Sequence, residues 1–321
     1  VSGEKARIGI IGTGSRGMFH INHLLQMPQV EVVALCDNYR PHLEDAAQYY
    51  PQAKQYDDYR RLLEDNNVQG VIIATPLYLH GRMTMDALRA GKRVFCEKSM
   101  AFTLDEALEV YNLRKELGGV LFIGQQRLFD PKYIKAMQMI HEGVIGDVVG
   151  VRNYWYRNND WRREVPSPEL ERHINWRLYS DYSRGLMTEL ACHQLQNGSW
   201  AMGMLPEKVM GSGSLIHWNK VDKRDVYDCV TAIFTYPNGV NMTFESIISN
   251  KHFGMGEQIL GSKGTIDLVT GMHYTDEPAP KGSGMHQLVE QIENGVMSNS
   301  VFAGTSWAAE TSALAPGMPI M

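Results

Sequence analysis

Short apolar runs alternate with stretches of helical apolar spacing over the first 125 residues of the chain. The apolar runs predict buried strands at residues 8–11, 30–36, 68–76, 93–98 and 120–126. Helices are predicted between them, as at 83–92 and at 103–118, where Thr103 is placed to cap the N-terminus. Repeated strand–helix units of this kind predict an α/β fold, with a parallel sheet covered by helices on both faces.

After residue 126 the pattern changes to strands in succession. One helix is predicted over 130–146, and strands follow at 147–157, 207–218, 227–239, 240–249 and 256–269. Tyr236–Val240 and Gly261–Thr265 carry the Asn-Gly and glycine chemistry of hairpin turns. Residues 275–287 are expected to form a loop that leads into a final helical stretch. The pattern therefore predicts two domains, 1–125 and 126–321, the second of α+β type on a large, mainly antiparallel open sheet.

Three glycines stand between the first predicted strand and a predicted helix, one face of which carries the apolar residues Phe19, Ile21, Leu24 and Leu25. Gly12, Gly14 and Gly17 form a G-x-G-x-x-G pattern that also contains Ser15 and Arg16. In such a pattern the first glycine permits a sharp turn, the second lets a pyrophosphate approach, and the third lets the helix pack on the strand. The N–H groups at the start of the helix then bind phosphate oxygens. We interpret residues 1–125 as an NAD(P)-binding Rossmann domain, with a tight turn that binds no ligand as the alternative.

An acidic residue at the end of the second strand supports the nucleotide interpretation. Asp37 stands where a carboxylate accepts hydrogen bonds from the ribose hydroxyls and repels a 2′-phosphate. NAD is therefore favoured over NADP, although the nearby Arg40 can accommodate the phosphate of NADP. Gly12, Asp37, Thr75 and Lys98 all fall at C-terminal ends of predicted strands, where parallel sheets bind their ligands.

Composition narrows the classes of function. The chain has 44% hydrophobic and 21% charged residues, as an ordinary globular protein does, and its formal net charge of −5 argues against a nucleic-acid-binding surface. No apolar run is long enough for a membrane span. The four cysteines form no C-x-x-C pair, which argues against structural zinc and a disulfide framework. Because the chain begins at Val1, we expect that a preceding segment was removed; the compartment is then the cytoplasm, or the periplasm if that segment was an export signal.

Longer stretches carry a resemblance to a known family. They are GIIGTGSRG (9–17), ATPLYLH (74–80), GKRVFCEKSM (91–100), NWR (175–177) and GLMTELACHQLQNGSW (185–200). Together they resemble the glucose–fructose oxidoreductase, inositol dehydrogenase and rhizopine-catabolism family, abbreviated Gfo/Idh/MocA. Three positions depart from its pattern: Ser99 replaces the proline of E-K-P, Leu77 replaces the asparagine after T-P, and Glu189 replaces the aspartate of D-x-x-x-H.

The resemblance implies an oxidoreductase that transfers a hydride between NAD(P) and a secondary alcohol of a sugar, glycoside or polyol. It implies that His193 is the general base, that Lys98 binds and polarises the reacting oxygen, and that Glu189 orients His193 or shares its proton. Trp176 and Arg177 are expected to close over the cofactor. The other expected cofactor-binding residues are Gly12, Gly14, Ser15, Arg16, Gly17, Asp37, Thr75, Pro76, His80, Glu97 and Lys98, and the expected substrate-binding residues are Lys98, Gln126, Arg127, Tyr156 and His193.

The chemistry of alcohol oxidation agrees with this choice of residues. Loss of a hydride from a carbinol requires a base for the hydroxyl proton, and the pKa of histidine suits that role near neutrality. An ammonium beside the oxygen stabilises the negative charge that develops on it. No metal is expected to take part, because the histidines and carboxylates show neither H-x-x-x-H nor H-E-x-x-H spacing.

Each assignment has an alternative. His193 can be a hydrogen-bonded core histidine, Lys98 a solvated strand-end lysine, and the aromatic residues of 153–163 sheet packing rather than a sugar platform. If His193 is not the base, Tyr156 and Tyr179 are the next candidates. Two other functions stay open: a glycosidase that uses tightly bound NAD transiently, and a nucleotide-dependent sensor, against which the presence of both Lys98 and His193 argues. The expected partners are a small carbohydrate substrate and copies of this chain, as a homodimer or homotetramer, since the family covers its open sheet by pairing subunits.

Overall fold

The computed structural model describes residues 3–275 and 317–321, which divide into two compact units. The first unit comprises the residues up to Gln126 together with 159–192 and 214–229, and the second comprises 127–158, 193–213 and the described residues from 230 onwards. The sequence prediction did not assign the segments 159–192 and 214–229 to the first domain. The predicted loop after Thr275 and the helical stretch that follows it lie outside the described residues.

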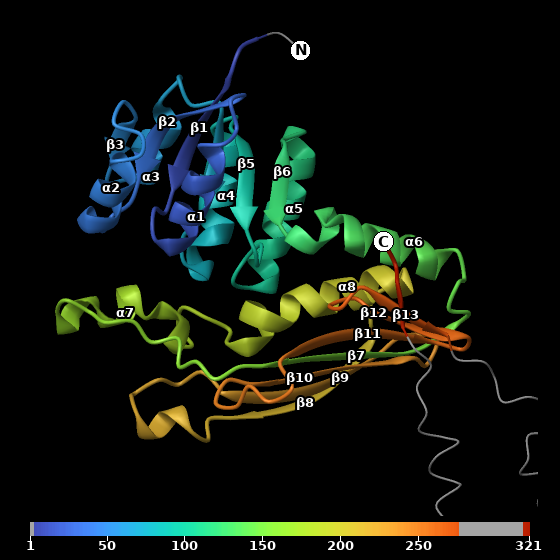
Figure 1. The fold of residues 1–321 in the computed structure, drawn as a ribbon. Coiled ribbons are helices and arrows are strands. Elements are labelled where there is room, and N and C mark those ends of the chain that lie inside the picture. Colours follow the sequence, from blue (N-terminus) through green and yellow to red (C-terminus); the bar gives the residue numbers. More distant parts are fainter. Residues whose placement is uncertain (1–2, 276–316) are drawn as a thin grey trace, which may run out of the picture. The chain divides into compact units, whose positions relative to one another are not determined.

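The first unit is built on a parallel sheet with the strand order β3-β2-β1-β4-β5-β6 (Figure 1). This order reverses between β1 and β4, and doubly wound sheets bind their ligands beyond the strand ends at such a point. The sequence prediction missed β3, because its residues KQY are few and show no apolar alternation. The strands are β1 (Ala6–Ile11), β2 (Val30–Cys36), β3 (Lys54–Tyr56), β4 (Gly70–Ile73), β5 (Arg93–Glu97) and β6 (Leu121–Gly124).

Helices cover both faces of this sheet, and each face has its own apolar core. Ile10 packs in one core with Ile21 of α1, whereas the next residue, Ile11, packs in the other with Leu62 of α3 and Leu88 of α4. Neighbouring strand residues point to opposite faces, so a run of isoleucines fills both cores. The helices are α1 (Ser15–Leu24), α2 (Arg40–Ala47), α3 (Tyr59–Glu64), α4 (His80–Arg89) and α5 (Leu104–Leu117).

The buried side of α1 differs from the one that apolar spacing indicated. Phe19 and Leu25 were grouped with Ile21 on the packed face, but they are 46% and 50% exposed. The helix instead buries Gly17 one turn before Ile21. That part of the prediction is wrong, because the close approach of Gly17 to the carbonyl of Gly12, directly after β1, sets the rotation of the helix.

The second unit is built on a larger sheet with the order β14-β13-β12-β11-β7-β10-β9-β8 (Figure 1). The central strand β7 pairs antiparallel with β11 and parallel with β10, and β11, β12, β13 and β14 follow one another in antiparallel pairs. The strands are β7 (Val148–Tyr156), β8 (Lys208–Ser214), β9 (Cys229–Thr235), β10 (Asn241–Ile247), β11 (Met255–Gly261), β12 (Gly264–Asp267), β13 (Met272–Thr275) and β14 (Met318–Pro319). The predicted α/β architecture, with a Rossmann sheet and a mainly antiparallel second sheet, is confirmed.

Helices α6 (Pro131–His141) and α8 (Cys192–Met202) pack on one face of the second sheet. Met137 of α6 and Ala201 of α8 join Val151, Met242 and Ile259 of the strands in one core. No helix in residues 3–275 and 317–321 is long and apolar enough to cross a membrane. Short helices lie at Leu77–Leu79, Gln126–Phe129, Pro168–Leu170, Glu171–Ile174 (α7), Trp176–Leu178, Met187–Ala191 and Trp218–Lys220.

Candidate active site

The turn between β1 and α1 has the backbone geometry of a phosphate-binding loop. Gly12 has φ of +88°, and a Cβ there would lie 2.8 Å from the carbonyl carbon of Ala74. A Cβ at Gly17 would overlap the carbonyl oxygen of Gly12, whereas at Gly14 the nearest atom would be 3.4 Å away, on His42. In the described part of the chain no side chain caps α1, and its first turn has no acidic residue. The N-terminal N–H groups of α1 are thus available to phosphate oxygens, and the turn fits a dinucleotide.

Asp37 directly follows β2, and main-chain N–H groups hold its carboxylate. Oδ2 accepts a hydrogen bond from Thr13 N at 2.8 Å, and Oδ1 accepts one from Tyr39 N at 2.8 Å. Burial raises the pKa of Asp37, but His42 and the two amides together outweigh it and bring the pKa below its usual value. The side chain of Arg40 is paired with Glu44 at 2.8 Å. Asp37 is therefore an ionised acceptor at neutral pH, as its predicted ribose-binding role requires.

His80 stands at the start of α4, and both of its ring nitrogens contact carbonyl oxygens. Nδ1 lies 2.7 Å from Ser99 O and Nε2 lies 2.9 Å from Thr75 O, with the residue 2% exposed. Because a neutral imidazole has one N–H, two carbonyl acceptors require the imidazolium. Burial lowers the pKa of His80, but Cys96 and the two carbonyls outweigh it and raise the pKa to about 9. The two ring nitrogens of His80 thus join the loop after β4 to the loop after β5, and its expected contact with the cofactor stays a prediction.

Thr75 and Pro76 lie in the loop between β4 and α4. Besides its bond to His80, Thr75 places its hydroxyl 3.6 Å from the sulfur of Met83. Pro76 precedes the short helix Leu77–Leu79. The two residues therefore lie at the C-terminal end of β4, the location that the sequence predicted for them.

Glu97, the last residue of β5, pairs with two residues of α1. Its Oε1 lies 2.6 Å from Arg16 Nε and 2.7 Å from His20 Nε2. Burial raises the pKa of Glu97, but His20 and Arg16 lower it by more, so that the pKa is below its usual value. His20 was not among the predicted site residues. Its spacing of four residues from Arg16, which puts both on one helix face, was the available signal.

Lys98 follows Glu97, and its ammonium reaches Glu189 of the π-helical turn Met187–Ala191. Nζ donates to Glu189 O at 2.9 Å and lies 3.7 Å from Glu189 Oε2. The same Oε2 accepts a hydrogen bond from Arg177 Nε at 2.9 Å. The peptide bond between Lys98 and Ser99 is cis, and the hydroxyl of Ser99 donates to Thr188 O at 3.1 Å. Arg177 thus compensates Glu189 at shorter range, and the ammonium of Lys98 retains charge and N–H donors for a ligand.

Trp176 lies directly against Arg177 in the short helix Trp176–Leu178. The guanidinium carbon of Arg177 is 4.3 Å from the centre of the Trp176 ring. Both residues belong to the first unit, as the glycine turn does. Their closure over a cofactor stays a prediction.

Two predicted substrate-binding residues, Gln126 and Arg127, follow β6. Gln126 is exposed, whereas Arg127 is 8% exposed and forms an ion pair with Glu257 of β11. Glu257 is fully buried and also accepts a hydrogen bond from Asn197 Nδ2 at 2.7 Å. The guanidinium of Arg127 is therefore paired inside the second unit, and its contact with a substrate stays a prediction.

The remaining predicted residues, His193 and Tyr156, lie on different faces of the second sheet. His193 of α8 is 5% exposed, and its ring centre lies 6.2 Å from that of Trp155. Tyr156 is the next residue of β7 and points to the other face, where its hydroxyl donates to Glu245 Oε2 at 2.7 Å. Trp155, which was not among the predicted site residues, is thus the aromatic residue beside His193.

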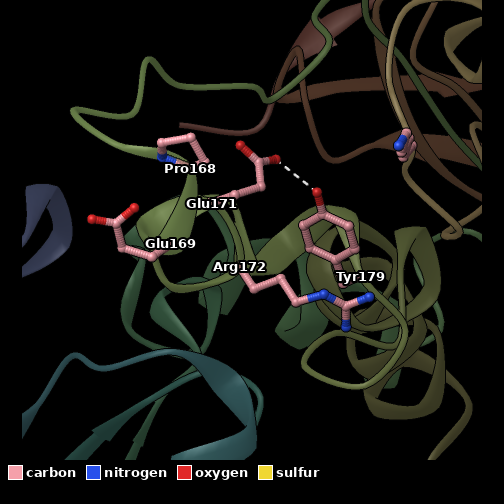
Figure 2. Close-up of a pocket in the computed structure, with 6 residues that line it drawn as sticks. Pro168, Glu169, Glu171, Arg172 and Tyr179 are labelled. Carbon is pink, nitrogen blue, oxygen red and sulfur yellow. Dashed lines mark hydrogen bonds between the residues drawn. The ribbon is translucent and has the colours of Figure 1, made fainter.

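Tyr179, the other candidate base, lines a pocket of about 330 Å³ in the first unit (Figure 2). Figure 2 shows its hydroxyl directed at Glu171, to which it donates a hydrogen bond at 2.6 Å. Burial raises the pKa of Tyr179, and Glu171 raises it further, so this hydroxyl is a poor base near neutrality. The pocket is lined by Pro168, Glu169, Glu171, Arg172, Tyr179 and Lys223.

Metal ligation has no evident place in the described residues. Within 3–275 and 317–321, no three side chains of His, Cys, Asp or Glu are grouped so that they could hold a metal ion. The absence of a metal from the reaction stays a prediction.

Comparisons with known proteins agree with this geometry. Residues 6–125 match the model of the oxidoreductase family with an NAD-binding Rossmann fold, and residues 133–267 match the GFO/IDH/MocA C-terminal domain. A myo-inositol 2-dehydrogenase of Thermotoga maritima is 26% identical over 86% of this chain and 80% of its own length. A glycosyl hydrolase family 109 protein of Stenotrophomonas maltophilia is 25% identical over 87% of this chain and 71% of its own.

A solved structure gives the same fold. The crystal structure of myo-inositol 2-dehydrogenase from Lactobacillus plantarum superimposes with a TM-score of 0.71 and 23% identity, covering 82% of this chain and 76% of its own. The family models support a nicotinamide cofactor, and the names of the relatives are consistent with a dehydrogenase that acts on CH–OH groups. This chain belongs to the Gfo/Idh/MocA family of oxidoreductases.

Proposed function

We propose that the chain is an NAD-dependent dehydrogenase that transfers a hydride between nicotinamide and a secondary alcohol of a sugar, glycoside or polyol. The observation that carries this proposal is the position of Lys98. Lys98 directly follows β5, whose last residue, Glu97, pairs with Arg16 of the glycine turn, and the side chain of Lys98 is 16% exposed. A nearly buried cation with unused donors is suited to a substrate oxygen that becomes negative.

In the proposed reaction Lys98 binds the reacting oxygen and stabilises its charge. Bound NAD supplies the hydride acceptor. The main-chain oxygen of Glu189 accepts a hydrogen bond from Lys98 and so holds the ammonium in position. Arg177 neutralises the carboxylate of Glu189. The negative charge of Glu189 therefore competes little with the substrate oxygen for the ammonium.

The proton of the substrate hydroxyl is assigned to His193. This residue follows Glu189 by four positions in the chain, which supports joint action of the two. We expect the side chains of Lys98 and His193 to approach within about 8 Å in the active enzyme, because a base must come within hydrogen-bond reach of its proton.

A panel of inositols, sugars and glycosides incubated with NAD⁺ tests the proposal through the absorbance of NADH. We expect NADH to form with at least one compound, and the variant K98M to lose this activity while it still binds NADH. K54M is the matched control, because Lys54 lies on the surface in a pair with Asp65. A protein that binds NADH but reduces NAD⁺ with no member of the panel would contradict the proposal.

The similarity to a glycosyl hydrolase family 109 protein supports one alternative, a glycosidase that oxidises a ring hydroxyl transiently. The same panel separates the two functions. Cleavage of a glycoside without net NADH formation indicates the hydrolase, whereas NADH in proportion to the oxidised product indicates the dehydrogenase.

A further inference from the structure

Arg163 contacts the glycine turn from a distant part of the sequence. Its Nη2 donates to Ser15 Oγ at 2.8 Å, although the two residues are 148 positions apart. Ser15 is the first residue of α1, whose N-terminal N–H groups face the phosphate position of a dinucleotide. Both residues belong to the first unit. The contact therefore brings a cation to the turn that is expected to hold the pyrophosphate.

The main chain of Arg163 is fixed independently of its side chain. Arg163 N donates to Asn175 Oδ1 at 2.8 Å, and Asn175 Nδ2 donates to Arg163 O at 3.0 Å. Asn175 is 2% exposed. One buried side-chain amide thus binds both main-chain polar groups of Arg163, and the side chain of residue 163 can be replaced without loss of these bonds.

The neighbouring Arg162 shows what an arginine of this segment does when its role is structural. Its guanidinium forms a two-bond pair with Glu171, at 2.9 and 2.8 Å, and lies 3.5 Å from Asp222. Arg163, in contrast, forms no ion pair with any carboxylate in the described part of the chain. Burial and then the charge of Arg177 lower the pKa of Arg163, and a guanidinium still keeps its proton at any working pH. Its charge is left for an anion from outside the protein.

We infer that Arg163 binds the pyrophosphate of the dinucleotide together with the N-terminus of α1 and slows the release of the cofactor. The inference rests on the proposed NAD-dependent function and adds a residue that neither the glycine pattern nor the NWR motif contains. A charge-assisted hydrogen bond of this kind corresponds to a change in affinity of about tenfold to a hundredfold.

Calorimetry with NADH, ADP-ribose and adenosine tests the inference on the wild type and on R163M, R163K and R172M. We expect R163M to lower the affinity for NADH and for ADP-ribose by about tenfold or more. The affinity for adenosine, which lacks the pyrophosphate, should stay unchanged. R163K, which keeps the charge, should recover most of the loss. R172M is the matched control, because Arg172 lies on the same segment and pairs with Asp181 instead.

Stopped-flow displacement of bound NADH, followed by its fluorescence, measures the release rate. The lower affinity of R163M for NADH should arise mainly from faster release of NADH. S15A should show a smaller change in the release rate, because the charge of Arg163 remains. If R163M binds and releases NADH as the wild type does, the inference is overturned and the proposed function stands. If the wild type binds neither NADH nor ADP-ribose, both fail together.

Discussion

The charged residues around Lys98 and the ion pair of Arg127 with Glu257 each contain a buried carboxylate, Glu189 and Glu257, but they differ in charge balance. In the first unit, the carboxylate of Glu189 lies 2.9 Å from Arg177 and 3.7 Å from Lys98, so that one anion serves two cations. In the second unit, the carboxylate of Glu257 forms an ion pair with one cation, Arg127.

This difference separates a binding site from a structural pair. Where one carboxylate is shared, the second cation keeps part of its field and its donors for a ligand. Where the charges match and a neutral amide completes the bonding, as Asn197 does for Glu257, no charge is left over. We therefore expect substitutions in the first cluster to change turnover, and substitutions in the second to change stability.

The largest effect is expected from the proposed catalytic residues. K98M should lower kcat by about 10²–10³-fold, because it removes the donor that stabilises the negative oxygen. H193A should lower kcat by about 10²–10⁴-fold through loss of the base. Steady-state kinetics on the substrate found in the panel, with NADH affinity and the unfolding midpoint measured in parallel, checks both. Near-normal turnover in H193A would mean that the base lies elsewhere.

R127M should chiefly change stability. It leaves the carboxylate of Glu257 buried and without its cation, which costs about 3–5 kcal/mol. Burial raises the pKa of Glu257 even beside Arg127, so part of this cost should vanish at low pH, where the carboxyl is protonated. Urea unfolding gives the free energy, and the double variant R127M/E257L should recover much of the loss. A raised KM with unchanged stability would instead support the sequence-based assignment of Arg127 to the substrate.

His80 lies in the first unit, but we expect it to contribute to stability and not to turnover, as the pair of Arg127 with Glu257 does. Its pKa in the folded protein, about 9, is above that of an unfolded histidine, so its contribution to stability is complete below about pH 6.5 and is lost as the pH rises through about 9. The loss corresponds to about 3 kcal/mol. Urea unfolding across this range should show the decline in wild type and not in H80N. An equal decline in H80N would exclude His80 as its source.

The sequence was sufficient to place the residues of the candidate site at the ends of parallel strands. Gly12, Asp37 and Lys98 each follow an apolar run, and a parallel sheet brings such ends to one edge. These residues could be grouped without knowing the path of any loop. The i, i+4 spacing of Arg16 and His20 carried similar information, because both lie on one face of a helix.

Contacts that depend on loop paths were not predictable in this way. The bond of Arg163 to Ser15 joins residues 148 positions apart, and no periodicity relates them. The ion pair of Arg127 with Glu257 likewise joins a residue after β6 to a residue of β11, and no local pattern relates the two. The assignment of Arg127 to the substrate stays a prediction. Local pattern sets elements and strand ends, while the pairing of distant polar groups follows from the whole fold.

Asp37 is an anion that keeps hydrogen-bond acceptors for a ligand, as Lys98 keeps donors. The effect expected from it, a change in the ratio of two cofactor affinities, is the smallest of those predicted. Its two oxygens each accept one main-chain N–H, from Thr13 and Tyr39, and an ionised carboxylate has further lone pairs for ribose hydroxyls. Because its pKa is below the usual value, the carboxylate is negative at any physiological pH and repels the 2′-phosphate of NADP. NADH should therefore bind at least about tenfold more tightly than NADPH, or about 1.4 kcal/mol. Titration of the apoprotein with both cofactors measures the ratio, which should narrow in D37S and stay unchanged in R40M. Equal affinities in the wild type would mean that Arg40 leaves Glu44 for the phosphate and overrides the carboxylate.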